Sequence, residues 1–265
     1  MTSVLESSPV TVVEALRGNR STRPSADVTS GAGLRALLDD GIYAVLGATP
    51  PSMQIVVRAS SLGQPFLTSD LTLSSHGRLR GVLVNQILRL LSVGMVVDHA
   101  FDDAVCAWRS DAGANELIDH LDRLDDDERA RLATDVSAHC VTLTRSLGSI
   151  PPRWSPRSAV RTTQRLAGGS VILHDVIDLM IGTLDSEVAS VALFDVTTAP
   201  LGEGAERAMR YHALTQTLRT SIEPLRTCTF STATGELWIR DVDQELLTRS
   251  AHEVLACVND QWTRR

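Results

Sequence analysis

The chain has 265 residues, of which 43% are hydrophobic and 22% are charged. This length and composition allow a sizeable core, built as one large domain or as two small ones. No apolar run is long enough to span a bilayer, and the N-terminus lacks the basic region and long apolar stretch of a secretory signal. We therefore expect a cytoplasmic protein without membrane contact.

Charge and cysteine usage exclude further classes of protein. The net charge of −7 argues against a protein-wide attraction to phosphate backbones, so any nucleic-acid contact needs a local cluster of basic residues. The chain contains no lysine, so arginine supplies the permanently charged basic side chains. The cysteines stand far apart without a CxxC pair, which argues against structural zinc or an iron–sulfur cluster.

The first half of the chain reads as a tail followed by helices. Residues 1–32 are rich in Ser, Thr, Pro and Gly and predict a flexible tail. Apolar spacing then predicts, in chain order, a helix over 33–47, a short strand over 54–58, a helix over 78–97 and one or two helices over 115–147. The acidic run that begins at Asp125 suits a helix N-terminus. Residues 33–149 are thus predicted to be a mainly helical part.

The pattern changes at the proline-rich segment that begins at Ile150, where β-type segments start. The expected elements are strands over 158–166, 170–178, 188–196, 225–231 and 236–240, a helix over 203–218 and a closing helix from Asp243. Gly168 and Gly169 predict a tight turn between the first two strands. Residues 150–265 are therefore predicted to form an α/β core.

Two segments of this core resemble the hairpin and the following strand of a known nuclease superfamily. The segment GGSVILHDVIDLMIG, from Gly168 to Gly182, is similar to the hairpin "GG-x-V-x-L-x-G-x-x-D-L-x-x-G" of RecB-like PD-(D/E)XK nucleases. ALFDVTT, from Ala192 to Thr198, resembles their "D-x-K-T" strand. The order of the elements, an antiparallel hairpin, a third strand and a crossing helix, matches as well.

Segments outside the hairpin extend the resemblance to residues 78–92 and 150–260. RGVLVNQIL, from Arg80 to Leu88, is similar to the helix that reads "G-x-x-x-H-x-x-L" in active members. RYHALTQTL, which contains Tyr211, resembles the helix whose tyrosine follows the nuclease strand. The resemblance implies an α/β (α+β) restriction-endonuclease-like core, a mixed sheet flanked by helices, preceded by the N-terminal helical part.

The resemblance also implies a site. Asp178 and Asp195 would be the carboxylates that hold Mg²⁺ or Mn²⁺, leaving open positions for a phosphate oxygen and a water. Asp175, which stands at a glycine position of the hairpin, is a further candidate metal ligand. Thr197 and Tyr211 complete the candidate catalytic set.

The sequence departs from the family pattern at several of these positions. Thr197 occupies the lysine position and Asn85 the histidine position, and the glutamate often found on the first strand is absent. Arg207 replaces the glutamine that precedes the tyrosine by four residues. A threonine can orient a water but cannot supply the positive charge that a dianionic transition state needs. We therefore expect a degenerate centre with weak or absent activity.

A row of arginines is the only concentrated basic feature. Arg157, Arg161 and Arg165 are spaced by four, so they share one face of a strand or of a helix, and Arg153 precedes them. In a nucleic-acid-binding protein this row would contact phosphates, and binding would fall steeply with salt. A solvated face paired with nearby acids is the alternative interpretation.

Structural roles compete with functional ones at the individual site residues. Asp178 and Asp195 could cap turns at strand ends, and Tyr211 could pack against the sheet. A lone histidine such as His174 is more often hydrogen-bonded in place than a ligand, and His212 could lie on the surface.

Three functions therefore stay open. The first is a nucleic-acid-associated PD-(D/E)XK protein with a degenerate nuclease centre, retained for DNA binding or as the subunit of a protein partner. The second is an active metal-dependent DNase in which Arg161 or Arg207 replaces the charge of the lysine. The third is a protein-interaction scaffold without a nucleic-acid role.

Overall fold

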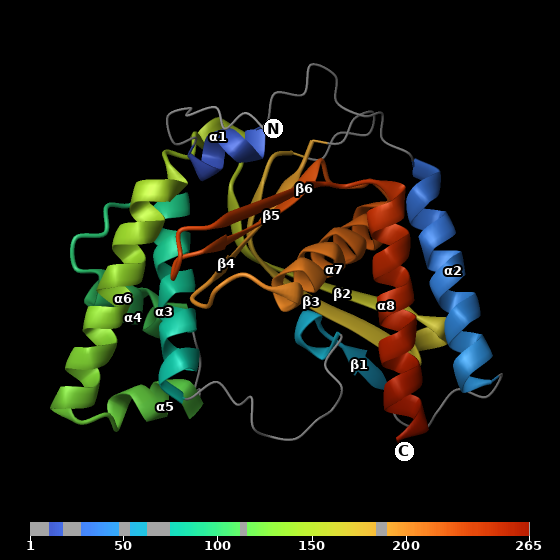
Figure 1. The fold of residues 1–265 in the computed structure, drawn as a ribbon, viewed down its shortest axis with the longest axis horizontal. Coiled ribbons are helices and arrows are strands. Elements are labelled where there is room, and N and C mark those ends of the chain that lie inside the picture. Colours follow the sequence, from blue (N-terminus) through green and yellow to red (C-terminus); the bar gives the residue numbers. More distant parts are fainter. Residues whose placement is uncertain are drawn as a thin grey trace, which may run out of the picture.

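The computed structural model describes residues 11–17, 28–47, 54–62, 75–111, 116–183 and 190–264 (Figure 1). Its helices are α1 (Val12–Arg17), α2 (Val28–Leu46), α3 (Ser75–Ser92), α4 (Ala100–Asp111), α5 (Glu116–Asp122), α6 (Asp126–Leu147), α7 (Glu203–Thr220) and α8 (Gln244–Thr263). Its strands are β1 (Ile55–Val57), β2 (Arg157–Leu166), β3 (Val171–Ile181), β4 (Ala192–Thr197), β5 (Arg226–Ser231) and β6 (Leu237–Asp241). Short 3-10 turns occupy Ala59–Ser61, Pro152–Trp154 and Ala167–Gly169. No helix in these ranges is long and apolar enough to cross a membrane.

The strands form one mixed sheet in the order β1-β3-β4-β5-β6, with β2 paired to β3. β1 runs parallel to β3 and β4 runs parallel to β5, whereas the β2–β3, β3–β4 and β5–β6 pairs are antiparallel. α7 crosses from β4 to β5 and thereby makes their parallel pairing possible. The predicted coarse class, an α/β fold with a mixed sheet flanked by helices, is confirmed.

Local sequence signals at the turns and helix ends are also confirmed. Gly168 and Gly169 adopt φ of 64° and 93° in the turn between β2 and β3, a region that glycine enters without steric cost. Asp125 caps α6, since its carboxylate accepts the amide of Glu128 at 2.8 Å. Asp243 caps α8 in the same way, accepting the amide of Leu246 at 2.8 Å.

Apolar side chains gather in two main clusters. One joins α3, α4 and α6 to α1, β4 and β5, and the other joins α2, α7 and α8 to β1 and the first half of β3. In Figure 1 the helices α3 to α6 lie at one end of the molecule, α2 and α8 at the other, and the sheet and α7 between them. Both clusters therefore use the sheet as a common wall.

This arrangement corrects the predicted division at residue 150. α2 and β1 lie in the sequence of the "helical part", yet Leu38 and Ile42 of α2 are fully buried in the same cluster as α7 and α8. Gly41 lets α2 approach α8 closely, because a Cβ there would meet a methyl of Leu255 at 2.6 Å. The apolar stripe of α2 packs on a partner that is far away in sequence, which periodicity alone does not reveal.

Three local expectations also differ from the structure. The flexible tail predicted over 1–32 is wrong for α1, because Val12, Val13 and Leu16 are buried in the first cluster, and α2 already begins at Val28. The helix predicted over 78–97 ends at Ser92, and Gly94 follows at φ +80°. α4 was not predicted. Residues 1–10 and 18–27 of the expected tail and 188–189 of the expected strand lie outside the described residues.

Candidate functional site

The sheet forks along β3. β2 occupies one edge of β3 over nearly its full length, from Val171 to Met180. The other edge is shared, because β1 pairs with Val171–Leu173 and β4 pairs with Leu179–Ile181. Residues 174–178 lie between these two partners, so the backbone groups there and on the diverging end of β4 need side-chain partners. Asp175 and Asp178 stand in this fork.

Asp178 links β3 to β4 and α3 by side-chain hydrogen bonds. Its Oδ2 accepts the amide of Val196 at 2.9 Å, just beyond Phe194, where β3–β4 pairing ends. Its Oδ1 accepts the side-chain amide of Asn85, on α3, at 3.0 Å. Both oxygens of the carboxyl group are therefore engaged by N–H donors of the protein itself.

Asp195 lies beside Asp178 and faces α7. Its neighbours Phe194 and Val196 are buried in the cluster with α3 to α6. Because successive residues of a strand point to opposite faces, Asp195 points to the other side, where α7 packs. Its side chain is 23% exposed, and Asp178 is likewise only partly buried.

Burial and the neighbouring Asp195 make Asp178 harder to ionise. Burial raises the pKa of Asp178 well above its ordinary value, and the charge of Asp195 and the hydrogen bond between the two carboxyl groups raise it further. A neighbouring like charge disfavours ionisation. Asp178 therefore keeps its proton to a higher pH than an ordinary aspartate does.

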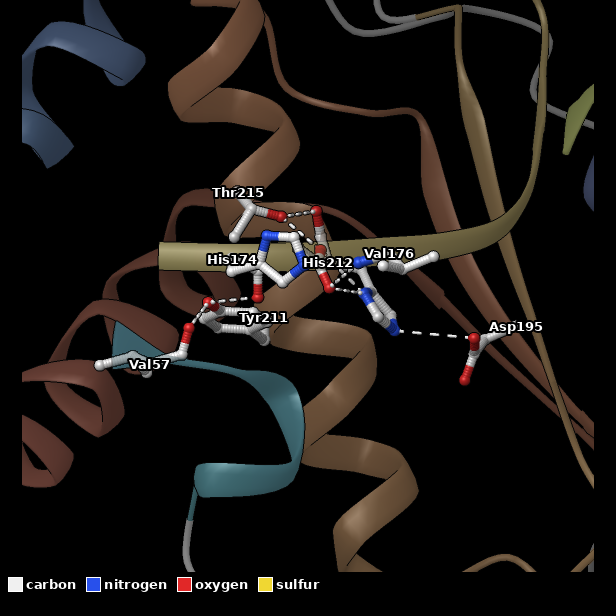
Figure 2. A network of polar contacts seen from close by, with 8 residues as sticks. Val57, His174, Val176, Asp195, Tyr211, His212 and Thr215 are labelled. Carbon is white, nitrogen blue, oxygen red and sulfur yellow. Dashed lines mark hydrogen bonds and ion pairs between the residues drawn. The ribbon is translucent and has the colours of Figure 1, made fainter. Parts of the chain in front are cut away.

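Asp175 and His212 form a buried pair next to these acids, and Figure 2 shows His212 and Asp195. Nδ1 of His212 lies 2.9 Å from both carboxylate oxygens of Asp175. The hydroxyl of Thr215 donates to Asp175 at 2.6 Å, and the amide of Val176 donates at 2.9 Å. The opposite ring atom of His212, Nε2, lies 3.8 Å from Oδ1 of Asp195. The imidazole thus links the two aspartates.

The pKa shifts of this pair agree with a buried ion pair. Burial alone would lower the pKa of His212, but the charge and hydrogen bond of Asp175, with those of Asp195, raise it well above its ordinary value. Burial alone would raise the pKa of Asp175, but His212, Thr215 and the amide of Val176 lower it on balance. His212 is therefore a cation and Asp175 an anion at neutral pH.

The prediction that His212 could lie on the surface is wrong. The residue is only 4% exposed, because α7 is buried on nearly all sides from Met209 to Leu218 by the sheet, α2 and α8. The available signal was this stretch itself, in which Arg210 is the only formally charged residue among neutral and weakly basic side chains. An apolar stripe does not predict a helix enclosed all round.

Tyr211 has a structural position. It is fully buried, and its hydroxyl donates to the carbonyl of Val57 on β1 at 2.8 Å and to that of His174 on β3 at 3.3 Å. Burial raises its pKa, and the charge of Asp175 raises it further. Tyr211 thus bridges β1 and β3 at the fork (Figure 2), and its hydroxyl is directed at these two carbonyls rather than at Asp178 or Asp195.

Thr197 lies two residues beyond Asp195, on the same face of β4. Its hydroxyl accepts the amide of Ala199 at 3.1 Å, and its carbonyl accepts from the amide and hydroxyl of Thr232 at 2.9 and 3.0 Å. The hydroxyl thus stabilises the turn after β4. At the lysine position of the resemblance, the residue supplies a turn contact and no charge.

The arginines of the row differ in burial and in hydrogen bonding. Arg157 is partly buried and donates to the carbonyl of Gly182 at 2.9 Å. Arg161 and Arg165 are exposed on β2, and their side chains make no ion pair within the described ranges. Arg153 is exposed in the turn before β2. The expected common face is thus solvent-exposed at two of its three strand positions.

Neither arginine proposed to replace the lysine reaches the acid pair. Arg161 pairs in register with Val176 and points to solvent. Arg207 forms an i,i+4 ion pair with Glu203 at 3.1 Å. The cation that does approach Asp195 is His212.

The residues present do not form a ready metal site. Within the described ranges, no group of three or more His, Cys, Asp or Glu side chains is arranged to hold a metal ion. Asp175, the third candidate ligand, is engaged by His212, Thr215 and Val176. The carboxylate oxygens of Asp175 and Asp178 are thus already used in hydrogen bonds.

Comparisons with known proteins leave the family open. No protein-family model matches the sequence, and no curated protein matches it. Among solved structures, the chain matches the protein SSO0001 over 86% of this chain and 87% of the other, with 10% sequence identity and a TM-score of 0.31.

Proposed function

We propose that this chain is a cytoplasmic, nucleic-acid-associated protein of the RecB-like PD-(D/E)XK type with a degenerate nuclease centre. The supporting observation is that Asn85, Asp178 and Asp195 lie together. The resemblance assigns these residues to one site, although they come from α3, β3 and β4. The hydrogen bond from Asn85 to Asp178 spans 93 positions of sequence.

The chemistry of the site supports loss of cleavage. The lysine position holds Thr197, whose hydroxyl accepts a local amide. The carboxyl group of Asp178 accepts two N–H donors, and burial and the charge of Asp195 raise its pKa. Phosphodiester hydrolysis by such a pair needs ionised oxygens free for a cation and a cation free for the phosphate. This arrangement favours a retained scaffold over a working centre.

Contact with nucleic acid is assigned to the exposed arginines. Arg161 and Arg165 stand on β2, which pairs only with β3 and so forms an edge of the sheet. Their guanidinium groups lack acidic partners within the described ranges, so binding a phosphate breaks no internal ion pair. A local row of this kind can bind DNA despite the net charge of −7.

A cleavage assay tests the degenerate centre. Purified protein is incubated with single- and double-stranded DNA in Mg²⁺ or Mn²⁺ over a range of pH, together with Asp195→Ala and Thr197→Lys. The exposed Asp260→Asn serves as the control for a changed carboxylate. We expect no cleavage by the wild type. Activity that Asp195→Ala abolishes and Asp260→Asn preserves would support the active DNase instead.

A binding assay separates the nucleic-acid role from the scaffold role. Affinity for a fluorescent duplex and for a single strand is measured without metal at several salt concentrations. The proposal expects binding that weakens steeply with salt. Absence of binding at low salt to both forms would favour a protein partner, the third hypothesis.

A further inference from the structure

We infer that His212 occupies the place of a divalent cation beside Asp178 and Asp195, so that the acid pair is neutralised by a side chain of the chain itself. The inference deepens the proposed function, because it concerns the same acid pair. It assigns His212 a role as a built-in counter-ion that excludes metal from this site.

The first support is the fixed direction of the ring. Nδ1 of His212 faces both oxygens of Asp175 at 2.9 Å, which leaves Nε2 directed at Asp195, 3.8 Å away. Thr215 holds Asp175 from the next turn of the same helix. The ring is 4% exposed, so it cannot leave the acid without opening the contact between α7 and the sheet. Figure 2 shows the imidazole of His212 with its contact to Asp195 as a dashed line.

The second support is the polarity of the groups around Asp178. A hard divalent cation needs oxygen ligands, but Asp178 meets N–H donors from Asn85 and Val196. Asn85 presents its amide nitrogen to Asp178 and not its oxygen. The site is therefore organised to satisfy carboxyl groups with donors.

Manganese binding by the full chain tests the inference. Free Mn²⁺ is measured by electron paramagnetic resonance during titration of wild type, His212→Ala and the matched control His174→Ala. His174 lies on β3 as well but contacts Thr163 on the neighbouring strand, at 3.4 Å. We expect His212→Ala to bind one Mn²⁺ at least about tenfold more tightly than wild type, a change of the size that alterations around metal sites produce. His174→Ala should behave as wild type.

Two further arms identify the site. Asp195→Asn in the His212→Ala background should remove the gained binding. Imidazole added to His212→Ala should compete with Mn²⁺, because it restores the missing ring. An unchanged Mn²⁺ affinity in folded His212→Ala, or a gain that survives Asp195→Asn, contradicts the inference.

If His212→Ala does not fold, the measurement on the wild-type protein still decides the test. Circular dichroism and thermal unfolding check each variant, and His212→Gln is the second choice because its amide can still donate to Asp175. Tight Mn²⁺ binding by wild type that Asp195→Asn abolishes overturns the inference outright. That result leaves salt-dependent DNA binding untouched, whereas loss of DNA binding with metal still excluded would overturn the proposed function alone.

Discussion

The two faces of the β2–β3 hairpin place their charged side chains in opposite environments, buried on one face and exposed on the other. On one face Thr162 pairs in register with Asp175, whose carboxylate is buried and held by His212 and Thr215. One position along, Arg161 pairs with Val176, and both are exposed. A shift of one residue therefore separates an internally neutralised network from a row of cations open to solvent.

The difference separates structural from functional charge. A buried charge must have an internal partner, because desolvation costs several kcal/mol per ion. An exposed arginine without a partner costs little and remains available for a phosphate. We therefore expect the inner face to control stability and the outer face to control binding.

Removal of Asp175 should have the largest effect on stability. Asp175→Ala leaves the buried His212 cation without its main partner, and breaking such a pair costs about 3–5 kcal/mol. Urea unfolding measures the loss, with the exposed Asp260→Ala as the control. A loss below about 1 kcal/mol would show that the Asp175–His212 pair does not hold α7 against the sheet.

Removal of one hydroxyl from the inner face should have a smaller effect. Tyr211→Phe leaves the carbonyl of Val57 without its 2.8 Å donor, at a cost of about 1–3 kcal/mol for a buried unsatisfied group. Tyr43→Phe is the matched control, since Tyr43 is 47% exposed. Equal unfolding free energies for the two variants would contradict the bridging role of Tyr211.

The raised pKa of Asp178 should make stability depend on pH. The pKa of Asp178 is raised well above 3.8 in the folded chain. The folded state therefore holds a proton that the unfolded state has lost, and stability falls as pH rises from about 3.8 toward the raised value. The side chain introduced by Asp178→Asn cannot ionise. We therefore expect the free energy of unfolding of this variant, relative to that of wild type, to increase as pH rises.

Unfolding curves collected from pH 4 to pH 8 for both proteins measure this difference. His212 contributes a slope of the same sign above its ordinary pKa of 6.5, and it is present in both proteins. A constant difference between them over the whole range would rule out a raised pKa for Asp178.

The outer face should give the smallest change in stability. Arg161→Ala with Arg165→Ala should alter the unfolding free energy by no more than about 0.5 kcal/mol. DNA affinity should fall, and the slope of log K against log salt should decrease by about 0.9 for each phosphate that the variant no longer neutralises. Arg145→Ala with Arg240→Ala, both exposed, is the control. An unchanged slope would place the nucleic-acid interface elsewhere.

The local features could be predicted from the sequence. Strand alternation, helical spacing and turn residues predicted β2, β3, β5, β6, α7 and α8 within a few positions, together with the caps Asp125 and Asp243. These features depend on neighbours within a few residues, so a linear pattern contains them. The resemblance also selected Asn85, Asp178 and Asp195 as members of one site.

The side chains that lie beside the acids could not be predicted, because they are set by how distant elements pack. The packing of α2 against α8 and the enclosure of α7 bury His212, although no stripe in α7 marks it as an inner residue. In the same packing, the Tyr211 hydroxyl donates to the carbonyl of Val57 and Arg157 donates to the carbonyl of Gly182. Arg161 stays exposed to solvent. Such roles depend on which elements meet in space, and periodicity describes each element only by itself.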